Sequence, residues 1–390
     1  LNNFLQVISK NMRIGIDCRK ILNPDTHEQA GVAHYTQYLL EHLLALDHTN
    51  HYTLFVDHLF KPLPKLKRTN STVHVVPFSQ YKRYLPFVYS HMLLAGELEE
   101  ARLDLFHAPF PALPLRYKGR SIVTVHDMAI FHHPEWFPSV SKQLFATKVV
   151  VPRSIKHAAH IIAVSHATAL DTQRLFQVPS NNITVIPEGV VLEEVLPSET
   201  SKRILEKFML QKPYLLFVGT LEPRKNIPRI IEAFLRLRNN DMEFPYTLVL
   251  AGGKGWNNKK IFTALDAAEP WVRYLGPVSH EDKIALMSNA TVFVWPSLWE
   301  GFGLPPLEAM ALGIPVVTSN VTSLPEVVSD AALCVDPTSV EAIVDALQKV
   351  LYDKELRKEL SQKGKKRAQQ FSWEKTAQAT LEVYSKTVGR

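Results

Sequence analysis

Short apolar runs and longer amphipathic stretches alternate along this chain, and they do so in two successive series. The first series opens with the strand-like run 13–17 and the helix-like stretch 32–46, and it continues to the strand-like run 183–186. The second series restarts at 214–218 and continues to the helix-like stretch 340–351. Strands that alternate with helices are typical of βαβ units in a parallel sheet. The chain is therefore predicted to form two α/β domains, each with a doubly wound, Rossmann-like sheet.

A polar stretch at 189–202, which contains Pro197, separates the two series and is typical of a linker. We expect an N-terminal domain over residues 12–195 and a C-terminal domain over residues 203–372. Residues 1–11 lack a basic flank followed by a long apolar stretch. They are therefore not expected to be a signal peptide. Because Met12 directly precedes a strand-like run, residues 1–11 are expected to be an upstream extension or an addition that is not native to the chain.

The composition is that of an ordinary globular protein, and it narrows the possible functions. Of the 390 residues, 46% are hydrophobic and 21% are charged, which excludes disorder as the main state. The longest apolar runs fall well short of the roughly 20 residues of a membrane-spanning helix. The two cysteines, Cys18 and Cys334, form neither a disulfide framework nor a CxxC metal motif, which favours a reducing, cytoplasmic location.

The net charge is mildly positive, because 44 Lys and Arg residues outnumber 38 Asp and Glu residues to give +6. Nucleic-acid-binding proteins carry denser basic stripes with interleaved aromatic residues, so we expect no nucleic-acid partner. A mild positive charge is compatible with an anionic substrate or an anionic membrane surface. The stretch 81–89 mixes basic and aromatic residues and could contact a membrane peripherally, although an ordinary helix surface explains it more simply.

Ligands bind such sheets at the carboxyl ends of the strands, and two loops there carry residues suited to phosphate. Gly31 precedes a predicted helix, whose N-terminal N–H groups and dipole favour an anion, although a simple loop-to-helix turn explains it equally well. Arg224 and Lys225 are adjacent cations between a strand and a helix, and such a pair can neutralise a diphosphate. The alternative for this pair is a solvated basic turn.

The most specific segment follows the fourth strand-like run of the second series. Glu300 lies on its glycine-rich loop, and Glu308 lies one turn into a helix that a proline pair can start. The backbone N–H groups of Phe302, Gly303 and Leu304 would point to the same place as the helix N-terminus. Carboxylates that accept hydroxyl hydrogen bonds beside N–H donors suit a sugar joined to a phosphate. The alternative, two helix-start acids favoured by the dipole, leaves the glycines and prolines unexplained.

These residues give the chain a resemblance to a known enzyme family. Glu300 and Glu308 stand eight positions apart in EGFGLPPLEA, which resembles the E-x7-E motif of retaining family 4 glycosyltransferases. The resemblance runs along nearly the whole chain and includes RIGIDCRK, AGVAHYTQYLL, TVHDM, GTLEPRKN, LAGGKGW and FSWEKTAQATLEVY. It implies the GT-B fold, in which two Rossmann-like domains face each other across a cleft. Residues 373–390 would form a C-terminal helix that returns to the N-terminal domain.

The resemblance implies roles for residues of the C-terminal domain, which would bind the nucleotide sugar. Arg224 and Lys225 would bind the donor diphosphate, together with the three backbone N–H groups of the glycine-rich loop. Glu300 would hold hydroxyls of the donor sugar. Glu308 would accept hydrogen bonds from the ribose hydroxyls, and Val278 would lie near the base.

In the N-terminal domain, which would bind the acceptor, the resemblance implies that Gly31 lets the backbone approach the diphosphate. His126 and Asp127, at the end of a strand, would face the transferred sugar and the acceptor. These two residues and Glu300 are therefore the expected catalytic residues. A histidine at a strand end is about as often structural, so a purely structural role for His126 stays open.

The chain also departs from the resembled family at several positions. Ala33 and His34 stand where many relatives have glycine and arginine, which leaves open how closely this loop covers the phosphate. Thr220 stands where many relatives have arginine, and Arg224 would supply that charge instead. Glu188 replaces a common asparagine, and the sequence suggests no role for it.

The implied reaction transfers a hexose from a nucleotide diphosphate sugar to an acceptor hydroxyl. Because the chain holds no DxD sequence, we expect no metal cofactor, and Arg224, Lys225 and the N–H groups would stabilise the leaving diphosphate. The chain looks most like mannosyltransferase-like members that build bacterial surface polysaccharides. GDP-mannose is therefore the expected donor, and a glycan or lipid-linked glycan is the expected acceptor, in the cytoplasm or at the inner face of the membrane.

Other classes of protein remain open and predict different observations. A glycosidase would also use two carboxylates but needs no nucleotide site. A sugar-nucleotide epimerase of the same fold would convert the donor without an acceptor, and a non-catalytic sugar-nucleotide-binding protein would bind it without turnover. A dinucleotide-dependent dehydrogenase needs a GxGxxG sequence after a strand, which neither opening loop has.

Overall fold

The structure is a computed structural model that describes residues 11–19, 21, 31–59, 66, 68–78, 87–241 and 243–389, with the backbone alone for residues 87–91 and 142. Residues 81–86 of the basic and aromatic stretch 81–89 lie outside the described residues, so its predicted membrane contact stays a prediction.

The chain divides into two compact units. The first contains Leu1–Met128, Ser139–Gly189 and Trp373–Arg390, and the second contains Ala129–Pro138 and Val190–Ser372. This division differs from the sequence-based boundaries, which placed residues 129–138 and 190–195 in the first domain.

Contacts explain why residues 129–138 group with the second unit. The indole Nε1 of Trp256 donates to the carbonyl oxygen of Trp136 at 2.8 Å. The rings of His132 and Trp299 also stack, with their centroids 4.7 Å apart. Aromatic contacts of this kind depend on which loops meet in space, and hydrophobic periodicity does not encode that.

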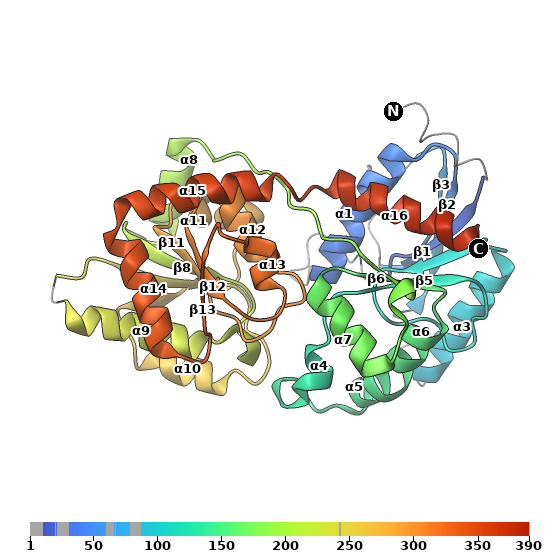
Figure 1. Ribbon diagram of the computed structural model, residues 1–390, viewed down its shortest axis with the longest axis horizontal. Helices are drawn as coiled ribbons and strands as arrows, with labels where there is room; N and C mark the ends of the chain where they lie inside the picture. The colour runs from blue at the N-terminus through green and yellow to red at the C-terminus, as the bar shows by residue number, and fades with distance from the viewer. Residues whose placement is uncertain are drawn as a thin grey trace. The chain divides into compact units, whose positions relative to one another are not determined.

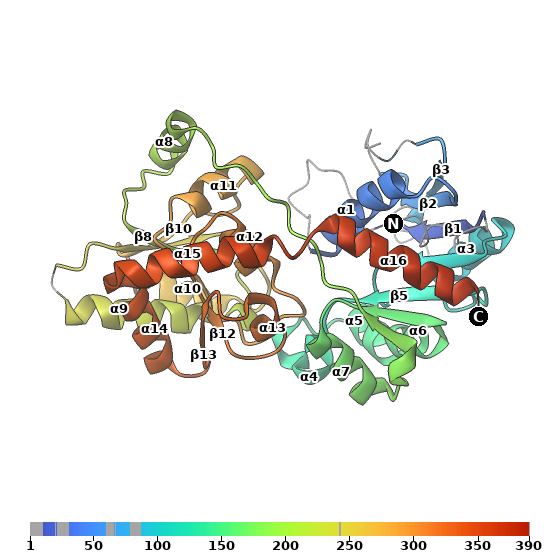
Figure 2. The ribbon, with the colours of Figure 1, turned by 45° about the horizontal axis from the view of Figure 1, so that its top comes forward.

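The first unit is a parallel sheet with helices on both faces (Figures 1 and 2). Its strands lie in the order β3-β2-β1-β4-β5-β6-β7. The strands are β1 (Arg13–Asp17), β2 (His51–Asp57), β3 (Ser71–Val76), β4 (Leu105–Ala108), β5 (Ser121–Val125), β6 (His160–Ala163) and β7 (Ile183–Val185). The described helices are α1 (Gly31–Leu46), α3 (Phe87–Glu100), α5 (Ser141–Phe145), the π-helix η4 (Ala146–Val150), α6 (Val151–His157), α7 (His166–Phe176), η5 (Ser180–Asn182) and α16 (Trp373–Val388).

The second unit repeats this architecture with the strand order β10-β9-β8-β11-β12-β13. Its strands are β8 (Tyr214–Val218), β9 (Thr247–Ala251), β10 (Val272–Tyr274), β11 (Val292–Trp295), β12 (Val316–Ser319) and β13 (Leu333–Val335). The described helices are α4 (Ala129–His132), η3 (Pro134–Trp136), α8 (Ser198–Lys207), η6 (Pro223–Lys225), α9 (Ile227–Asn240), α10 (Lys259–Asp266), α11 (His280–Ser288), α12 (Leu304–Ala311), α13 (Leu324–Val328), α14 (Val340–Tyr352) and α15 (Lys354–Ala368).

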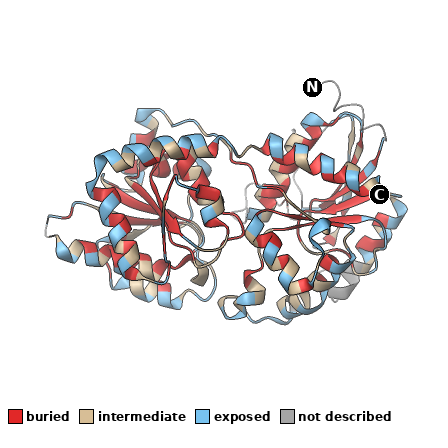
Figure 3. Ribbon diagram, viewed as in Figure 1, coloured by how far each residue is buried: buried red, intermediate tan, exposed pale blue. Residues whose placement is uncertain are grey.

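Both sheets are therefore doubly wound, which confirms the predicted fold class. The central strands β4, β5, β8 and β11 are buried along their whole length, whereas the helices expose one face (Figure 3). This burial explains why these strands are near-continuous apolar runs. In each unit the strand order reverses between two central strands, β1 and β4 or β8 and β11. Ligand sites in such sheets lie at that reversal, outside the carboxyl ends of the strands.

The final helix belongs to the first unit and is tied to its sheet by buried polar side chains. α16 lies beside α1 in both views (Figures 1 and 2). The hydroxyl of Tyr384 is 2.6 Å from Nδ1 of His107, whose Nε2 is 2.8 Å from the hydroxyl of Thr124 on β5. These bonds satisfy polar groups that burial would otherwise penalise.

Candidate functional site

The loop after β8 places two cations at the point where the strand order of the second unit reverses. The short helix η6 in this loop carries Arg224 and Lys225. The next residue, Asn226, has φ 62°, and its side-chain amide donates to the carbonyls of Pro296 and Pro337 at 2.9 and 2.7 Å. Asn226 thus joins this loop to the loops after β11 and β13, which gives the two cations defined positions.

Glu300, on the loop after β11, is the carboxylate that these cations meet. Its Oε1 accepts hydrogen bonds from Lys225 Nζ at 2.6 Å, Ser297 Oγ at 2.6 Å and Trp295 Nε1 at 3.0 Å. Its Oε2 lies 3.6 Å from a terminal nitrogen of Arg224. Burial opposes the charge of Glu300, but the charges of Lys225 and Arg224 hold its pKa below the ordinary range. Glu300 is therefore ionised at neutral pH.

A second carboxylate, Glu222, holds Arg224 from the other side. Nε of Arg224 donates to Glu222 Oε1 at 2.5 Å, and Glu222 is only 2% exposed. Its Oε2 has no hydrogen-bond partner among the described residues. Burial, and then the charge of Arg224, lower the pKa of Lys225. Glu222, Lys225 and Glu300 are thus buried together, with Arg224 partly exposed beside them. The removal of any one of the four leaves a charge of this cluster uncompensated.

The glycine-rich loop between Glu300 and α12 presents backbone N–H groups. Gly303 has φ 116° and ψ 48°, and a Cβ there would lie 2.8 Å from a side-chain atom of α13, so this position requires glycine. The hydroxyl of Ser323 donates to the carbonyls of Glu300 and Phe302 at 3.0 and 2.7 Å and fixes the loop. Leu304 then begins α12. Because Pro305 and Pro306 carry no N–H and the N–H of Leu307 donates to the carbonyl of Gly303 at 3.4 Å, Leu304 supplies the backbone donor of this first turn. Such N–H groups suit an anionic group.

The residues predicted to bind ribose and base lie around the start of α11. Oε1 of Glu308 accepts a hydrogen bond from Nζ of Lys283 at 2.8 Å, and the two side chains are 22% and 23% exposed. Val278 lies in the loop before α11, next to Ser279, which caps that helix. The first turn of α11 therefore connects Val278 to Glu308. Their contacts with ribose and base stay predictions.

In the first unit, Gly31 begins α1, and His126 and Asp127 directly follow β5. Gly31 is exposed, and a Cβ there would meet no atom of the described residues within 4 Å. Protein packing therefore does not require glycine at this position, and its approach to a diphosphate stays a prediction. Because His126 and Asp127 belong to the first unit and Glu300 to the second, the mutual geometry of the three expected catalytic residues stays a prediction as well.

His126 is enclosed and engaged through both ring nitrogens. Nδ1 lies 3.1 Å from Oε1 of Glu188, and Nε2 lies 2.8 Å from the carbonyl oxygen of Pro109. The ring of Tyr35, from α1, meets the His126 ring edge-on with a centroid distance of 4.7 Å. Burial opposes the charge of His126, but Glu188 and the Pro109 carbonyl raise its pKa above the ordinary value. These two contacts therefore favour the charged form of His126.

Several residues of these clusters are not recognisable in the sequence. Ser297 offers a weak signal, because a hydroxyl three residues before Glu300 can reach back to it. Trp295 offers none, since a tryptophan at the end of a buried strand is typical of a core residue. Glu188 stands out only as a departure from the resembled family, and its partner His126 lies 62 positions away.

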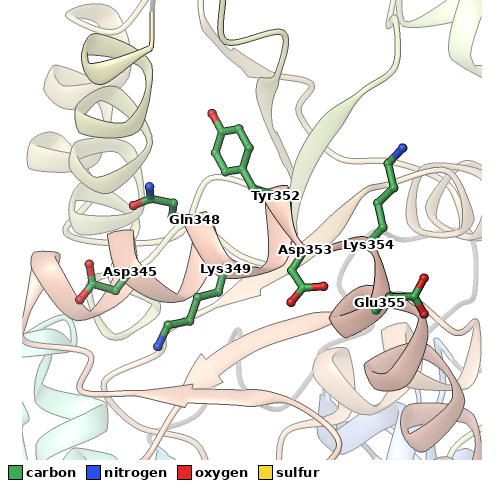
Figure 4. A pocket seen from close by; sticks show the side chains of 7 residues that line it. All are labelled: Asp345, Gln348, Lys349, Tyr352, Asp353, Lys354 and Glu355. Atoms are coloured by element: carbon green, nitrogen blue, oxygen red, sulfur yellow. The ribbon is translucent and has the colours of Figure 1, made fainter.

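A separate depression of about 770 Å³ lies at the junction of α14 and α15 and includes Tyr352, Asp353 and Lys354 in its lining (Figure 4). Its side chains carry both signs of charge and point in different directions (Figure 4). Binding sites usually have a few polar groups that converge on one place. This depression is therefore a weaker candidate than the cluster around Glu300.

In the described part of the chain, no group of three or more His, Cys, Asp and Glu side chains is arranged to hold a metal ion. None of the described helices is long and apolar enough to cross a membrane.

Comparison with known protein families gives a match for each half of the chain. Residues 30–194 match the model described as Glycosyltransferase Family 4. Residues 199–367 match the model described as Glycosyl transferases group 1.

Individual proteins are also similar to this chain. The O-antigen chain mannosyltransferase B of Escherichia coli is 37% identical over 295 residues, which cover 74% of this chain and 76% of that protein. The serotype-specific mannosyltransferase WbdA of Escherichia coli is 31% identical over 299 residues, which cover 74% of this chain but 36% of that longer protein. The solved structure of Anabaena Alr3699/HepE in complex with UDP-glucose has a TM-score of 0.73 at 17% identity, and the match covers 96% of this chain and 100% of that one. This structural likeness confirms the expected fold.

Proposed function

This chain belongs to the family 4 glycosyltransferases, and we propose that it transfers mannose from GDP-mannose to a glycan hydroxyl in surface-polysaccharide synthesis, with retention of configuration. The observation that carries the proposal is the cluster of Arg224, Lys225 and Glu300, in which Glu300 lies on the same loop as the backbone N–H groups of Phe302, Gly303 and Leu304. The two Escherichia coli relatives are named as mannosyltransferases, which supports mannose as the transferred sugar.

The cluster suits the diphosphate and the sugar of such a donor for separate reasons. Lys225 carries three N–H hydrogens and makes one hydrogen bond to a described residue, so it can donate to a phosphate oxygen as well. Oε1 of Glu300 already accepts three hydrogen bonds, and Oε2 faces Arg224 at 3.6 Å. Oε2 is therefore the oxygen that would accept hydrogen bonds from sugar hydroxyls.

In the proposed reaction the bond between C1 of mannose and the diphosphate oxygen breaks, and a bond from C1 to the acceptor oxygen forms on the same face. The acceptor proton passes to the leaving diphosphate. Negative charge grows on that diphosphate, where Arg224, Lys225 and the N–H groups of Phe302, Gly303 and Leu304 would stabilise it. We propose that this positive charge replaces a metal ion.

The remaining predicted roles complete the proposed complex. Glu308 would bind the ribose hydroxyls and Val278 would contact guanine. In the first unit, Gly31 would let the backbone approach the diphosphate, while His126 and Asp127 would face mannose and the acceptor.

We propose a lipid-linked glycan as the acceptor, met at an anionic membrane surface. The net charge of +6 is compatible with such a contact. Flotation with vesicles that contain an anionic lipid tests this point, and no binding at low salt would contradict it.

Thermal unfolding with GDP-mannose, GDP, UDP-glucose and UDP, each with and without EDTA, tests the donor. A ligand at 100 times its dissociation constant adds about 2.7 kcal/mol to the free energy of unfolding. The midpoint should rise by about 2–4 °C in a protein of this size. We expect the shift with the guanosine compounds and no effect of EDTA.

Lys225→Ala should abolish this shift, whereas Lys363→Ala, which alters an exposed lysine of α15 paired with Asp330 and Glu359, should preserve it. The anomeric configuration of the product, read from its one-bond C1–H1 coupling, then tests retention. A shift with uridine compounds alone would change the donor. Donor turnover without an acceptor would favour an epimerase, and no shift with any nucleotide would contradict the proposal as a whole.

A further inference from the structure

The two polar partners of the His126 ring are both hydrogen-bond acceptors. Nε2 lies 2.8 Å from the carbonyl oxygen of Pro109. Because a carbonyl oxygen can only accept a hydrogen bond, Nε2 must carry a hydrogen. Nδ1 lies 3.1 Å from Oε1 of Glu188, and one hydrogen must lie between these two atoms. Imidazole is a stronger base than carboxylate, so this hydrogen resides on His126. The pair is therefore an imidazolium that donates twice and a carboxylate.

Because both side chains are largely buried, water does not readily replace either hydrogen-bond partner of His126. The side chains of His126 and Glu188 are only 15% and 6% exposed. A charge in such a place is costly unless an opposite charge and hydrogen bonds compensate it. The geometry supplies both, since each ring nitrogen has its own acceptor. Loss of the Glu188 charge would leave His126 without a charged hydrogen-bond partner.

The titratable groups around the ring agree with a fixed positive charge. On β4, burial and then the charge of His126 lower the pKa of His107 to about 3, so His107 is neutral. The rings of Tyr35, on α1, and His126 form a T-shaped contact. Burial raises the pKa of the Tyr35 hydroxyl, so this hydroxyl is neutral too. Asp127, the next residue in the chain, adds its negative charge to that of Glu188.

We propose that Glu188 is a positioning residue that keeps His126 as a doubly donating cation, so that His126 gives the site a fixed positive charge and a fixed ring orientation. A general base needs a nitrogen with a free lone pair, and neither nitrogen of this ring has one. His126 therefore does not take up the acceptor proton. This functional part of the inference rests on the proposed transfer reaction, in which that proton passes to the leaving diphosphate.

The inference also accounts for a residue that the sequence leaves unexplained. Many members of the resembled family have asparagine where this chain has Glu188. A neutral amide can accept from the ring or donate to it, so it does not hold a histidine in the charged form. In this chain the Glu188 carboxylate can only accept from the ring, so His126 stays charged across the neutral pH range.

The protonation state of His126 in the wild-type protein is the first test, and it needs neither donor nor acceptor. The protein contains 16 histidines, so the signals of His126 in long-range ¹H–¹⁵N spectra of ¹⁵N-histidine-labelled protein are assigned by their loss in His126→Asn. We expect two protonated ring nitrogens from pH 6 to pH 8. A neutral ring at pH 7.5 would overturn the proposal, whatever reaction the protein catalyses.

The second test compares Glu188→Gln with a matched control, Glu193→Gln. Glu193 also pairs with a histidine, His280, at 3.0 Å, but these side chains are 30% and 59% exposed. Glu188→Gln preserves a hydrogen-bond partner for Nδ1 and removes only the charge. We expect kcat to fall about tenfold or more at pH 8 and to recover below about pH 6, where His126 regains its proton.

The wild-type protein and Glu193→Gln should show no such inflection near pH 6. The donor-induced rise of the unfolding midpoint should persist in Glu188→Gln, which separates this inference from the proposed donor site. A pH profile of Glu188→Gln that parallels the wild type would overturn the positioning role. If Glu188→Gln does not fold, the spectra of the wild-type protein still decide whether His126 is charged.

Discussion

Each unit has a buried cation that contacts a carboxylate after a central strand: His126 contacts Glu188 in the first unit, and Lys225 contacts Glu300 in the second. The two pairs differ in how many N–H donors stay available to a ligand. In the first unit, both N–H groups of His126 point at fixed acceptors, Glu188 and the Pro109 carbonyl. In the second unit, Lys225 makes one hydrogen bond to a described residue, Glu300, and two of its hydrogens remain. A buried ion pair thus indicates an anion-binding site only when the cation has N–H groups that make no hydrogen bond within the protein. By this criterion we expect the second unit to bind the anion and the first to supply a fixed charge.

The largest expected effect follows from Glu300→Ala. This substitution leaves Lys225 and Arg224 buried with one carboxylate between them, and breaking such a cluster costs about 3–5 kcal/mol of the free energy of unfolding. Urea denaturation followed by circular dichroism measures the loss. Glu341→Ala, which removes an exposed partner of Arg236, serves as the control and should leave the urea midpoint unchanged. A loss below about 1 kcal/mol would mean that the four charges are not coupled.

The difference between the two cations is tested by comparing Lys225→Ala with His126→Asn. Lys225→Ala should lower transfer by about 10²–10³-fold and abolish the nucleotide-induced rise of the unfolding midpoint, because it removes the ammonium group that we propose binds the diphosphate. His126→Asn should retain that rise even if transfer slows. Thermal unfolding with GDP decides between them. The opposite result, in which His126→Asn loses the shift and Lys225→Ala keeps it, would reverse the assignment of the two units.

A smaller effect is expected from Gly303→Ala, which probes the N–H half of the anion site. A residue with a Cβ is strained at φ 116° and would also approach α13, so we expect a loss of about 1–3 kcal/mol of the free energy of unfolding and weaker nucleotide binding. Gly253→Ala is the matched control, because a Cβ there meets no described atom within 4 Å. Equal effects of the two substitutions would show that the conformation of Gly303 carries no special cost.

Sequence reasoning identifies the residues of the charged cluster in the second unit better than those of the His126–Glu188 pair in the first. Arg224, Lys225 and Glu300 each sit on a loop whose glycines and prolines are visible in the sequence, so local chemistry points to them. The pairing of His126 with Glu188 joins positions 62 residues apart, through the neighbouring positions of β5, β6 and β7 in the sheet. Periodicity predicts that strands exist but not their order in the sheet. Sequence reasoning therefore does not predict contacts that depend on strand order, such as that of His126 with Glu188. It also does not predict that residues 129–138 group with the second unit.

The smallest expected effect is on how the free energy of unfolding depends on pH. The His126–Glu188 pair and the Lys225–Glu300 pair should change it in opposite directions. The pKa of His126 is raised in the folded state, so the unfolded chain loses its proton first, and the free energy of unfolding falls as the pH rises above about 6.5. The pKa of Glu300 is lowered, so its contribution is present at neutral pH and is lost as the pH falls below about 4.3.

Urea midpoints measured from pH 4 to pH 9 separate these two contributions. Glu188→Gln should flatten the decline on the alkaline side and leave the acid side unchanged, because it removes the anion that holds the proton on His126. Glu300→Gln should do the reverse. Glu193→Gln, at the exposed pair with His280, should change neither side. If Glu188→Gln retained the full decline above pH 6.5, that decline would come from other groups, and the closed pair of the first unit would not hold its proton as its geometry implies.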